Sequence, residues 1–219
     1  MVRNALIAGA TGLVGHELVS QLIRTDYYNS IQVISRRAYT YEHQKVKSYI
    51  IDFNQLQSFN PDALIRDVYV CLGTTLKKAG SIENFRTVDY QYVVDLANWA
   101  IKHRVERFTV ISSVGADKNK KNYYLRTKGE MEEVLKSMGF RHLIILRPSL
   151  LLGKRKEIRV AEQLGKFLMT LYSPFFFGSL KNYKPVQATA VARNMFFSTI
   201  NSEESVRIVE NSEIINTDQ

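Results

Sequence analysis

The 219-residue sequence predicts an α/β fold in which helices cover both faces of a parallel sheet. Three observations support this prediction. Short apolar runs alternate with helical patterns, a glycine-rich turn joins the first run to the first helix, and polar side chains follow several of the runs. The composition, 45% hydrophobic and 23% charged, is typical of a globular domain with a substantial core. We therefore expect a single domain over residues 1–219.

The alternation of the two patterns defines the expected elements. Strands are expected at Ala5–Ala8, Ile31–Ser35, Val46–Ile51, Val68–Leu72, Phe108–Ser112, Leu143–Leu146 and Val206–Val209. Helices are expected at Leu13–Arg24, Glu83–His103, Tyr123–Met138, Ile158–Tyr172 and Thr189–Ile200. Strands separated by helices need crossover connections, which make the strands parallel. A sheet built in this way is buried on both faces.

A glycine-rich turn at Gly9–Gly15 follows the first strand and opens the first helix. Gly9 allows a tight turn, Gly12 lets the backbone approach a pyrophosphate, and Gly15 lets the helix pack closely on the strand. The start of the helix then offers free N–H groups and the positive end of its dipole to the phosphates. The order strand, glycine turn, helix predicts a Rossmann-type, doubly wound domain that binds a dinucleotide. The alternative is a turn that serves only to reverse the chain.

Residues Ser35–Arg37 follow the second strand, at the place where an acidic residue would bind the adenosine ribose of NAD. A hydroxyl and two guanidinium groups suit a 2′-phosphate instead, because arginine makes forked, charge-assisted contacts with phosphate. We therefore expect Ser35, Arg36 and Arg37 to favour NADP(H) over NAD(H). The alternative is that both arginines are solvated surface residues.

Further polar or small residues come directly after the other strands, where ligands bind in such sheets. Asp52 can bond the adenine amino group and Phe53 can flank the ring, while capping of a turn is an equal alternative for Asp52. Small residues let a cofactor lie close, although they also suit an ordinary tight turn. The same placement adds to the expected cofactor site Leu72, Gly73, Thr74, Ser112 and Arg147.

A serine, a tyrosine and a lysine after the fifth strand suit carbonyl chemistry. Tyr124 and Lys128 are four residues apart on the expected helix, so they share one face. The ammonium favours the phenolate and can also bond the nicotinamide ribose, while a serine hydroxyl holds the carbonyl oxygen. We expect Ser113, Tyr124 and Lys128 to be catalytic, with Ser112 as the alternative serine. Tyr124 can also be a partly buried helix residue, and the second Y-x-x-x-K match, Tyr41–Lys45, lies on the adenosine side.

Composition excludes several other classes of function. The net charge of +9 comes without a helix-turn-helix, zinc-finger or RNP-type signature, so we do not expect nucleic-acid binding. The single cysteine, Cys71, lies in an apolar run and excludes an internal disulfide. We expect no bound metal, no signal peptide and no transmembrane segment, and hence a cytoplasmic location.

The motifs together resemble the atypical, extended-type short-chain dehydrogenases/reductases, in particular the Tat-interacting-protein-like group of NAD(P)-binding oxidoreductases. The resemblance rests on Gly9–Gly15, on Cys71–Gly80 with Val88–Tyr90, and on Ile111–Asp117 with Tyr124 and Lys128. Arg147-Pro148 and Lys184–Val186 add to it. It implies a Rossmann-type domain with bound NADPH, a small C-terminal substrate region and a Ser-Tyr-Lys catalytic set. The residues that it implies for dinucleotide binding are Gly9, Thr11, Gly12, Leu13, Val14, Ser35, Arg36 and Arg37.

Residues from about 150 to 205 are expected to form the substrate side. Apolar residues at Leu150–Gly153, Phe167–Tyr172 and Pro174–Phe177 can line a pocket, although core packing is the simpler explanation for them. We predict an NADP(H)-dependent oxidoreductase that acts on a small carbonyl compound or the corresponding alcohol, with a homodimer also considered. The alternatives are an NADPH-sensing regulatory or protein-interaction module without turnover, and an epimerase or dehydratase that holds NAD(P) tightly.

Overall fold

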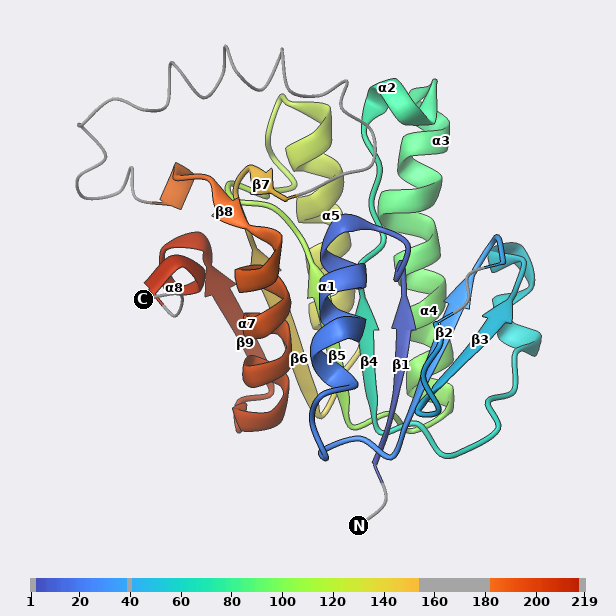
Figure 1. The fold of residues 1–219 in the computed structure, drawn as a ribbon. Helices are drawn as coiled ribbons and strands as arrows, with labels where there is room; N and C mark the ends of the chain where they lie inside the picture. The colour runs from blue at the N-terminus through green and yellow to red at the C-terminus, as the bar shows by residue number, and fades with distance from the viewer. Residues whose placement is uncertain (1–2, 39–40, 154–181, 217–219) are drawn as a thin grey trace.

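The protein, described here from a computed structural model that covers residues 3–38, 41–153 and 182–216, is built on one parallel sheet (Figure 1). The seven strands lie in the order β3-β2-β1-β4-β5-β6-β9, and every neighbouring pair is parallel. Their bounds are β1 Asn4–Ala8, β2 Ser30–Ser35, β3 Val46–Ile50, β4 Asp67–Val70, β5 Arg107–Ile111, β6 His142–Arg147 and β9 Val206–Glu210. The predicted Rossmann-type fold is confirmed, and the expected strands lie close to these bounds.

The helices also follow the prediction, with one interruption. Their bounds are α1 Leu13–Leu22, α2 Leu76–Ala79, α3 Ile82–Arg86, α4 Tyr92–Lys102, α5 Tyr123–Ser137, α7 Ala188–Asn201 and α8 Asn211–Asn216. The single helix expected at Glu83–His103 is divided into α3 and α4 by a π turn at Thr87–Gln91. The short elements α2 and α8, the 3₁₀ turn Phe53–Ser58, and the strand pair β7 (Leu151–Leu152) and β8 (Val186–Gln187) were not predicted.

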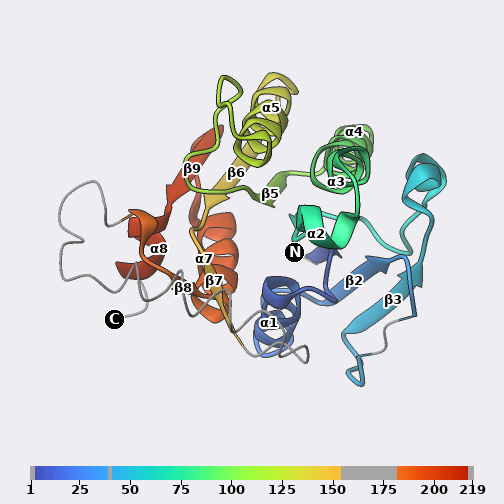
Figure 2. The ribbon, with the colours of Figure 1, turned by 90° about the horizontal axis from the view of Figure 1, so that it is seen from above.

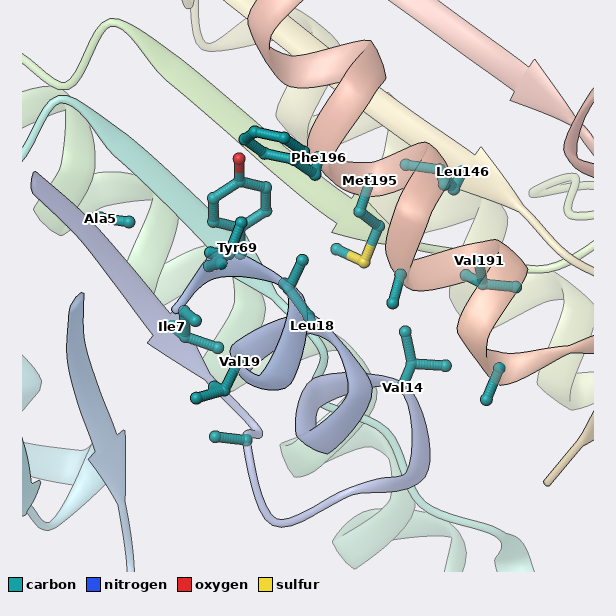
Figure 3. Packing of buried hydrophobic residues seen from close by; sticks show 14 of the residues in the cluster. Ala5, Ile7, Val14, Leu18, Val19, Tyr69, Leu146, Val191, Met195 and Phe196 are labelled. Carbon is teal, nitrogen blue, oxygen red and sulfur yellow. The ribbon is translucent and has the colours of Figure 1, made fainter. Parts of the chain in front are cut away.

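The helices lie in two layers, one on each face of the sheet. Seen from above, α1 and α7 lie on one side, and α4 and α5 lie on the other (Figure 2). Figure 3 shows Val14 and Leu18 of α1 turned toward Val191 and Met195 of α7, and all four side chains are buried. Helix α7, at residues 188–201, falls within the region expected to face substrate, yet it packs in this layer. The expected helix Ile158–Tyr172, the basic run Lys154–Arg159 and the aromatic segment Tyr172–Gly178 lie outside the described residues.

The strand order reverses at the centre of the sheet and thereby positions the site. Strand β1 is paired with β2 on one side and with β4 on the other, and all five of its residues are buried. The connections from β1 and β4 therefore leave in opposite directions and open a crevice at the carboxyl ends of the strands. Helix α2 lies at this end, at the top of Figure 1.

Helix α5 is held very close to the chain that precedes it. A Cβ atom added at Gly129 would overlap the backbone of Asp117 and the amide nitrogen of Lys118. Gly129 is buried in the middle of the helix, where glycine is otherwise unfavourable. Close packing therefore outweighs helix propensity at this position.

We predict that Gly129→Ala destabilises the protein. In a helix interior, alanine stabilises the folded state by about 1 kcal/mol relative to glycine, whereas overpacking destabilises it by about 1–3 kcal/mol. Urea unfolding followed by circular dichroism should show a lower free energy of unfolding for Gly129→Ala. The control Asn98→Ala, at an exposed position of α4, should show no decrease. A gain in stability for Gly129→Ala would contradict the close packing.

Candidate functional site

The glycine turn brings the start of α1 against the end of β4. Gly9 has φ +88°, which glycine adopts without strain, and a Cβ atom there would lie 2.5 Å from the Cys71 carbonyl. The Gly12 N–H donates to the Gly9 carbonyl at 2.9 Å and closes the turn. Gly12 is the N-cap of α1, and no side chain caps this end. The first N–H groups of α1 are thus left for an anion, as a pyrophosphate site requires.

The loop after β4 forms the opposite wall of the crevice. Gly73 is exposed, and a Cβ atom added there would have only the Asp89 carboxylate nearby, at 3.4 Å. Packing within the chain therefore does not require a glycine at this position, and its missing side chain leaves open space beside the turn at Gly9. Thr74 follows, and its N–H donates to Asp89 Oδ2 at 2.8 Å. The arrangement fits a dinucleotide lying between the two loops, with Leu72 at the base of the second one.

The expected 2′-phosphate residues lie at the carboxyl end of β2, next to the glycine turn. Ser35 is buried, and its hydroxyl donates to the Arg37 carbonyl at 2.6 Å. Arg36 and Arg37 are both exposed, and neither forms an ion pair with any described residue. Because β2 is paired with β1, this segment follows the strand next to the one that leads into the glycine turn.

The two residues expected at the adenine have local partners. Asp52 caps the turn Phe53–Ser58, and its Oδ1 accepts from the backbone N–H of Asn54 at 2.9 Å. The structure thus shows the capping contact, and a bond from the adenine amino group to the other oxygen of Asp52 stays a prediction. The Phe53 ring is 2% exposed and lies 5.1 Å from the Tyr92 ring. Phe53 belongs to the core in this structure, and its ring does not line the crevice.

Tyr124 and Lys128 lie one turn apart at the start of α5, as predicted. Asn122 caps this helix by accepting from the Leu125 N–H at 3.1 Å. Tyr124 is half-buried, with its ring 5.7 Å from that of Phe85. Lys128 is 3% exposed, and Tyr124 contributes to its electrostatic environment. The pair thus shares one face of α5 at the carboxyl edge of the sheet.

Lys128 is a buried cation with an acidic partner. Its Nζ lies 2.9 Å from Asp89 Oδ1 and donates to the Ile111 carbonyl at 3.3 Å. Burial is the largest single effect and disfavours the ammonium, but the attraction of Asp89, its hydrogen bond and the nearby Tyr124 and Glu132 together outweigh it, and the pKa of Lys128 lies above its usual value. The lysine is therefore a fixed positive charge.

The two candidate serines have different surroundings. The Ser112 hydroxyl donates to Glu132 Oε1 at 2.5 Å, so it is engaged in the interior. The Ser113 hydroxyl has only the carbonyl of Val114 within reach among the described residues, at a long 3.4 Å. Ser113 therefore has the hydroxyl that remains available for a ligand.

Arg147, which was expected in the cofactor site, is bound by two carboxylates of the protein. Its Nε and Nη2 donate to the two oxygens of Glu132, and its Nη1 donates to Glu210 at 3.0 Å. Glu132 is 1% exposed, and its hydrogen bonds raise the pKa of Arg147. The guanidinium is thus occupied by two carboxylates of α5 and β9, and no contact of it points toward the glycine turn.

Asp89 is the site residue that the sequence interpretation did not assign. It is 1% exposed and lies in the π turn, a feature that occurs often at functional sites. Its two oxygens contact Thr74 and Lys128, so one carboxylate connects the loop after β4 to α5. The signal in the sequence was an acidic residue on an apolar helix face, four residues from both Phe85 and Val93.

Tyr41, Lys45 and Cys71 all have contacts that stabilise the fold. The Tyr41 hydroxyl donates to the Ala10 carbonyl at 3.2 Å, and Lys45 donates to the Thr25 carbonyl at 2.7 Å. This second Y-x-x-x-K match therefore contacts the glycine turn and the segment that follows α1. Cys71 Sγ contacts Met195 Sδ at 3.7 Å, and burial raises the pKa of its thiol to about 12. A thiol of this kind is inert.

Two findings concern only the part of the chain that the structure describes. None of its helices is long and apolar enough to cross a membrane. Nor does it contain a group of three or more histidine, cysteine, aspartate or glutamate residues that could hold a metal ion.

The parallel sheet, its reversal point and the uncapped glycine turn are those of an NAD(P)-binding Rossmann protein. Residues 9–172 match the model of the NAD(P)H-binding family, and the chain belongs to this family. Rat protein HTATIP2 is 34% identical over 182 residues, which are 81% of this chain and 72% of that protein. Protein fmp52 of Aspergillus niger is 36% identical over 169 residues, or 73% of this chain and 71% of that protein.

Solved structures confirm the fold. WbmG of Bordetella bronchiseptica, in complex with NAD, has a TM-score of 0.70 and 15% identity, covering 99% of this chain and 76% of its own. Human epimerase family protein SDR39U1, solved with NADPH, has a TM-score of 0.66 and 13% identity, covering 96% and 77%. At these identities the likeness concerns the fold alone.

One expectation from the sequence is wrong. The fungal relatives from Aspergillus niger and Candida albicans are named as mitochondrial proteins, which contradicts the expected cytoplasmic location. The expectation rested on the lack of secretory and membrane signals. Such signals do not distinguish the cytoplasm from the interior of an organelle.

We predict that Arg147→Leu destabilises the protein by about 3 kcal/mol, because it leaves the buried Glu132 carboxylate without its main partner. Arg126→Leu is the matched control, since Arg126 pairs with Glu130 at 4.0 Å on the surface and should contribute less than about 1 kcal/mol. Chemical unfolding measures both. Unchanged stability together with lost NADPH binding in Arg147→Leu would instead support a direct role in cofactor binding.

Proposed function

We propose that this protein is an NADP(H)-dependent oxidoreductase that interconverts a small carbonyl compound and its alcohol. The observation that carries the proposal is the position of Tyr124 and Lys128. Both lie on one face of α5, at the same sheet edge as the glycine turn, and Ser113, whose hydroxyl has only a long contact to a backbone carbonyl among the described residues, follows the adjacent strand. These are the groups that carbonyl reduction needs beside a dinucleotide.

The preference for NADP(H) is proposed from the charges on the adenosine side. Arg36 and Arg37 are exposed cations directly beyond β2, and β2 lies next to the glycine turn. A 2′-phosphate bound there would be held by charge-assisted hydrogen bonds, and the ribose hydroxyl of NAD(H) would gain no comparable contact. Ser35 supports this loop, because its hydroxyl bonds the Arg37 carbonyl.

The chain's own residues divide the chemistry as follows. When bound, NADPH supplies the hydride, with its two electrons, to the carbonyl carbon. Ser113 donates a hydrogen bond to the carbonyl oxygen and holds it in place, and Tyr124 transfers its phenolic proton to the same oxygen as the alcohol forms. The phenolate that remains is stabilised by the ammonium of Lys128, which is one helical turn away. The reverse order of proton transfer serves alcohol oxidation.

We predict that Tyr124→Phe lowers turnover by at least about a hundredfold, because it removes the proton donor. Its binding of NADPH, measured by cofactor fluorescence, should stay close to the wild-type value. Turnover is followed as NADPH oxidation with a panel of small aldehydes, ketones and quinones. Tyr123→Phe, at the preceding residue, should behave like the wild type. Equal activity of Tyr124→Phe and the wild type would remove the catalytic assignment.

The same assays separate the other readings of the site. Tight NADPH binding with no oxidation across the panel would favour a sensing module. Conversion of a sugar nucleotide without net cofactor consumption would favour an epimerase or dehydratase.

The double variant Arg36→Ala/Arg37→Ala should bind NADPH about tenfold to a hundredfold more weakly, while NADH binding changes little. The matched control removes two exposed cations at the opposite edge of the sheet, Lys102 and Arg141. Titration of each protein with both reduced cofactors, followed by fluorescence, gives the ratio of affinities. An equal loss for NADPH and NADH would contradict recognition of the 2′-phosphate.

A further inference from the structure

Lys128 and Asp89 form an ion pair in the interior, beside the proposed proton donor. The Nζ to Oδ1 distance is 2.9 Å, and the two residues are 3% and 1% exposed. Water and salt screen a buried pair of this kind little, so both of its charges act on neighbouring groups over several ångströms. The charges of the ammonium and the carboxylate sum to about zero. The sequence alone indicated only the positive charge of Lys128.

The carboxylate is held firmly in this place. The π turn Thr87–Gln91 carries Asp89 at the junction of α3 and α4, and the Thr74 N–H donates to its second oxygen at 2.8 Å. Lys128 is equally constrained, since its ammonium also donates to the Ile111 carbonyl. Neither charge can turn away from the other without breaking a buried hydrogen bond.

Among the groups around Lys128, Asp89 is the one that offsets its positive charge. Tyr124 and Glu132 act on it from α5, and Asp89 acts from the π turn. Glu132 is already neutralised, because both of its oxygens bind the Arg147 guanidinium. The positive charge that faces Tyr124 is therefore reduced chiefly by Asp89.

We propose that Asp89 is a positioning residue that, by pairing with Lys128, holds that ammonium in place and offsets the positive charge that acts on the Tyr124 phenol. An unpaired ammonium beside the phenol would favour the phenolate, and a paired one favours it much less. Where Tyr124 is the proton donor of the proposed function, this pairing favours the form of the phenol that donates. This inference rests on the proposed function only for that consequence. The electrostatic claim concerns the protein without cofactor or substrate.

The test is a pH titration of the apo protein labelled with ¹³C at the tyrosine ring carbon that bears the hydroxyl. Its NMR signal moves when the phenol ionises, and Tyr124→Phe identifies the signal of Tyr124. In Asp89→Asn, which keeps an acceptor for the Thr74 N–H but removes the charge, the midpoint of the Tyr124 titration should fall by about one pH unit. Asp89→Glu, which keeps the charge, should restore the midpoint toward the wild-type value.

The control is Asp67→Asn, which removes another fully buried carboxylate, paired with Arg107 at 3.2 Å near the amino end of β4. It should leave the Tyr124 midpoint unchanged. Circular dichroism checks the fold of each variant, and Asp89→Ser takes the place of Asp89→Asn if the latter does not fold. An unchanged or higher midpoint in the neutral variants would overturn the proposal.

The result is independent of the proposed function, because neither NADPH nor a substrate is present in the titration. A shifted midpoint together with full activity of Tyr124→Phe would leave the electrostatic coupling in place and remove the catalytic role. An unshifted midpoint together with an inactive Tyr124→Phe would support the catalytic role and overturn the electrostatic coupling.

Discussion

The close approach of the first turn to the end of β4 is the constraint on which the site depends. A side chain at Gly9 would overlap the Cys71 carbonyl, and one at Gly15 would overlap the Gly9 carbonyl. Only with both glycines can α1 begin directly beside two neighbouring strand ends, at the point where the strand order reverses. The uncapped start of α1 lies at this junction.

Helix α5 is the second element that must be placed accurately, because it carries Tyr124. Two buried ion pairs, one turn apart along the helix, connect it to two different parts of the fold. Lys128 binds Asp89 of the π turn, and Glu132 binds Arg147 at the end of β6. A buried charge without a partner is costly, so each pair fixes the position and rotation of the helix. Gly129 lies between them and brings the helix against Asp117. Structural and chemical roles are therefore combined on this one face.

Much of the fold could be predicted because its signals are local. Apolar runs and helical spacing depend on neighbouring residues, and the glycine turn is a continuous segment. The π turn and the short helix α2 could not be predicted, since they depend on how the chain packs after β4 and not on periodicity. Asp52 caps the turn through one oxygen, as one of its two readings expected, and the other reading, a bond to adenine, stays a prediction.

By itself, the sequence determined the parallel α/β fold, the dinucleotide turn, the cations beyond β2 and the pairing of Tyr124 with Lys128 on one helix face. Each of these follows from residue types at fixed spacings along the chain. Only the tertiary structure decided that Glu132 binds the Ser112 hydroxyl and Arg147, and that Asp89 pairs with Lys128. These facts depend on the partners of buried polar groups. Such partners come from strands and helices far apart in the sequence, and no local pattern specifies them.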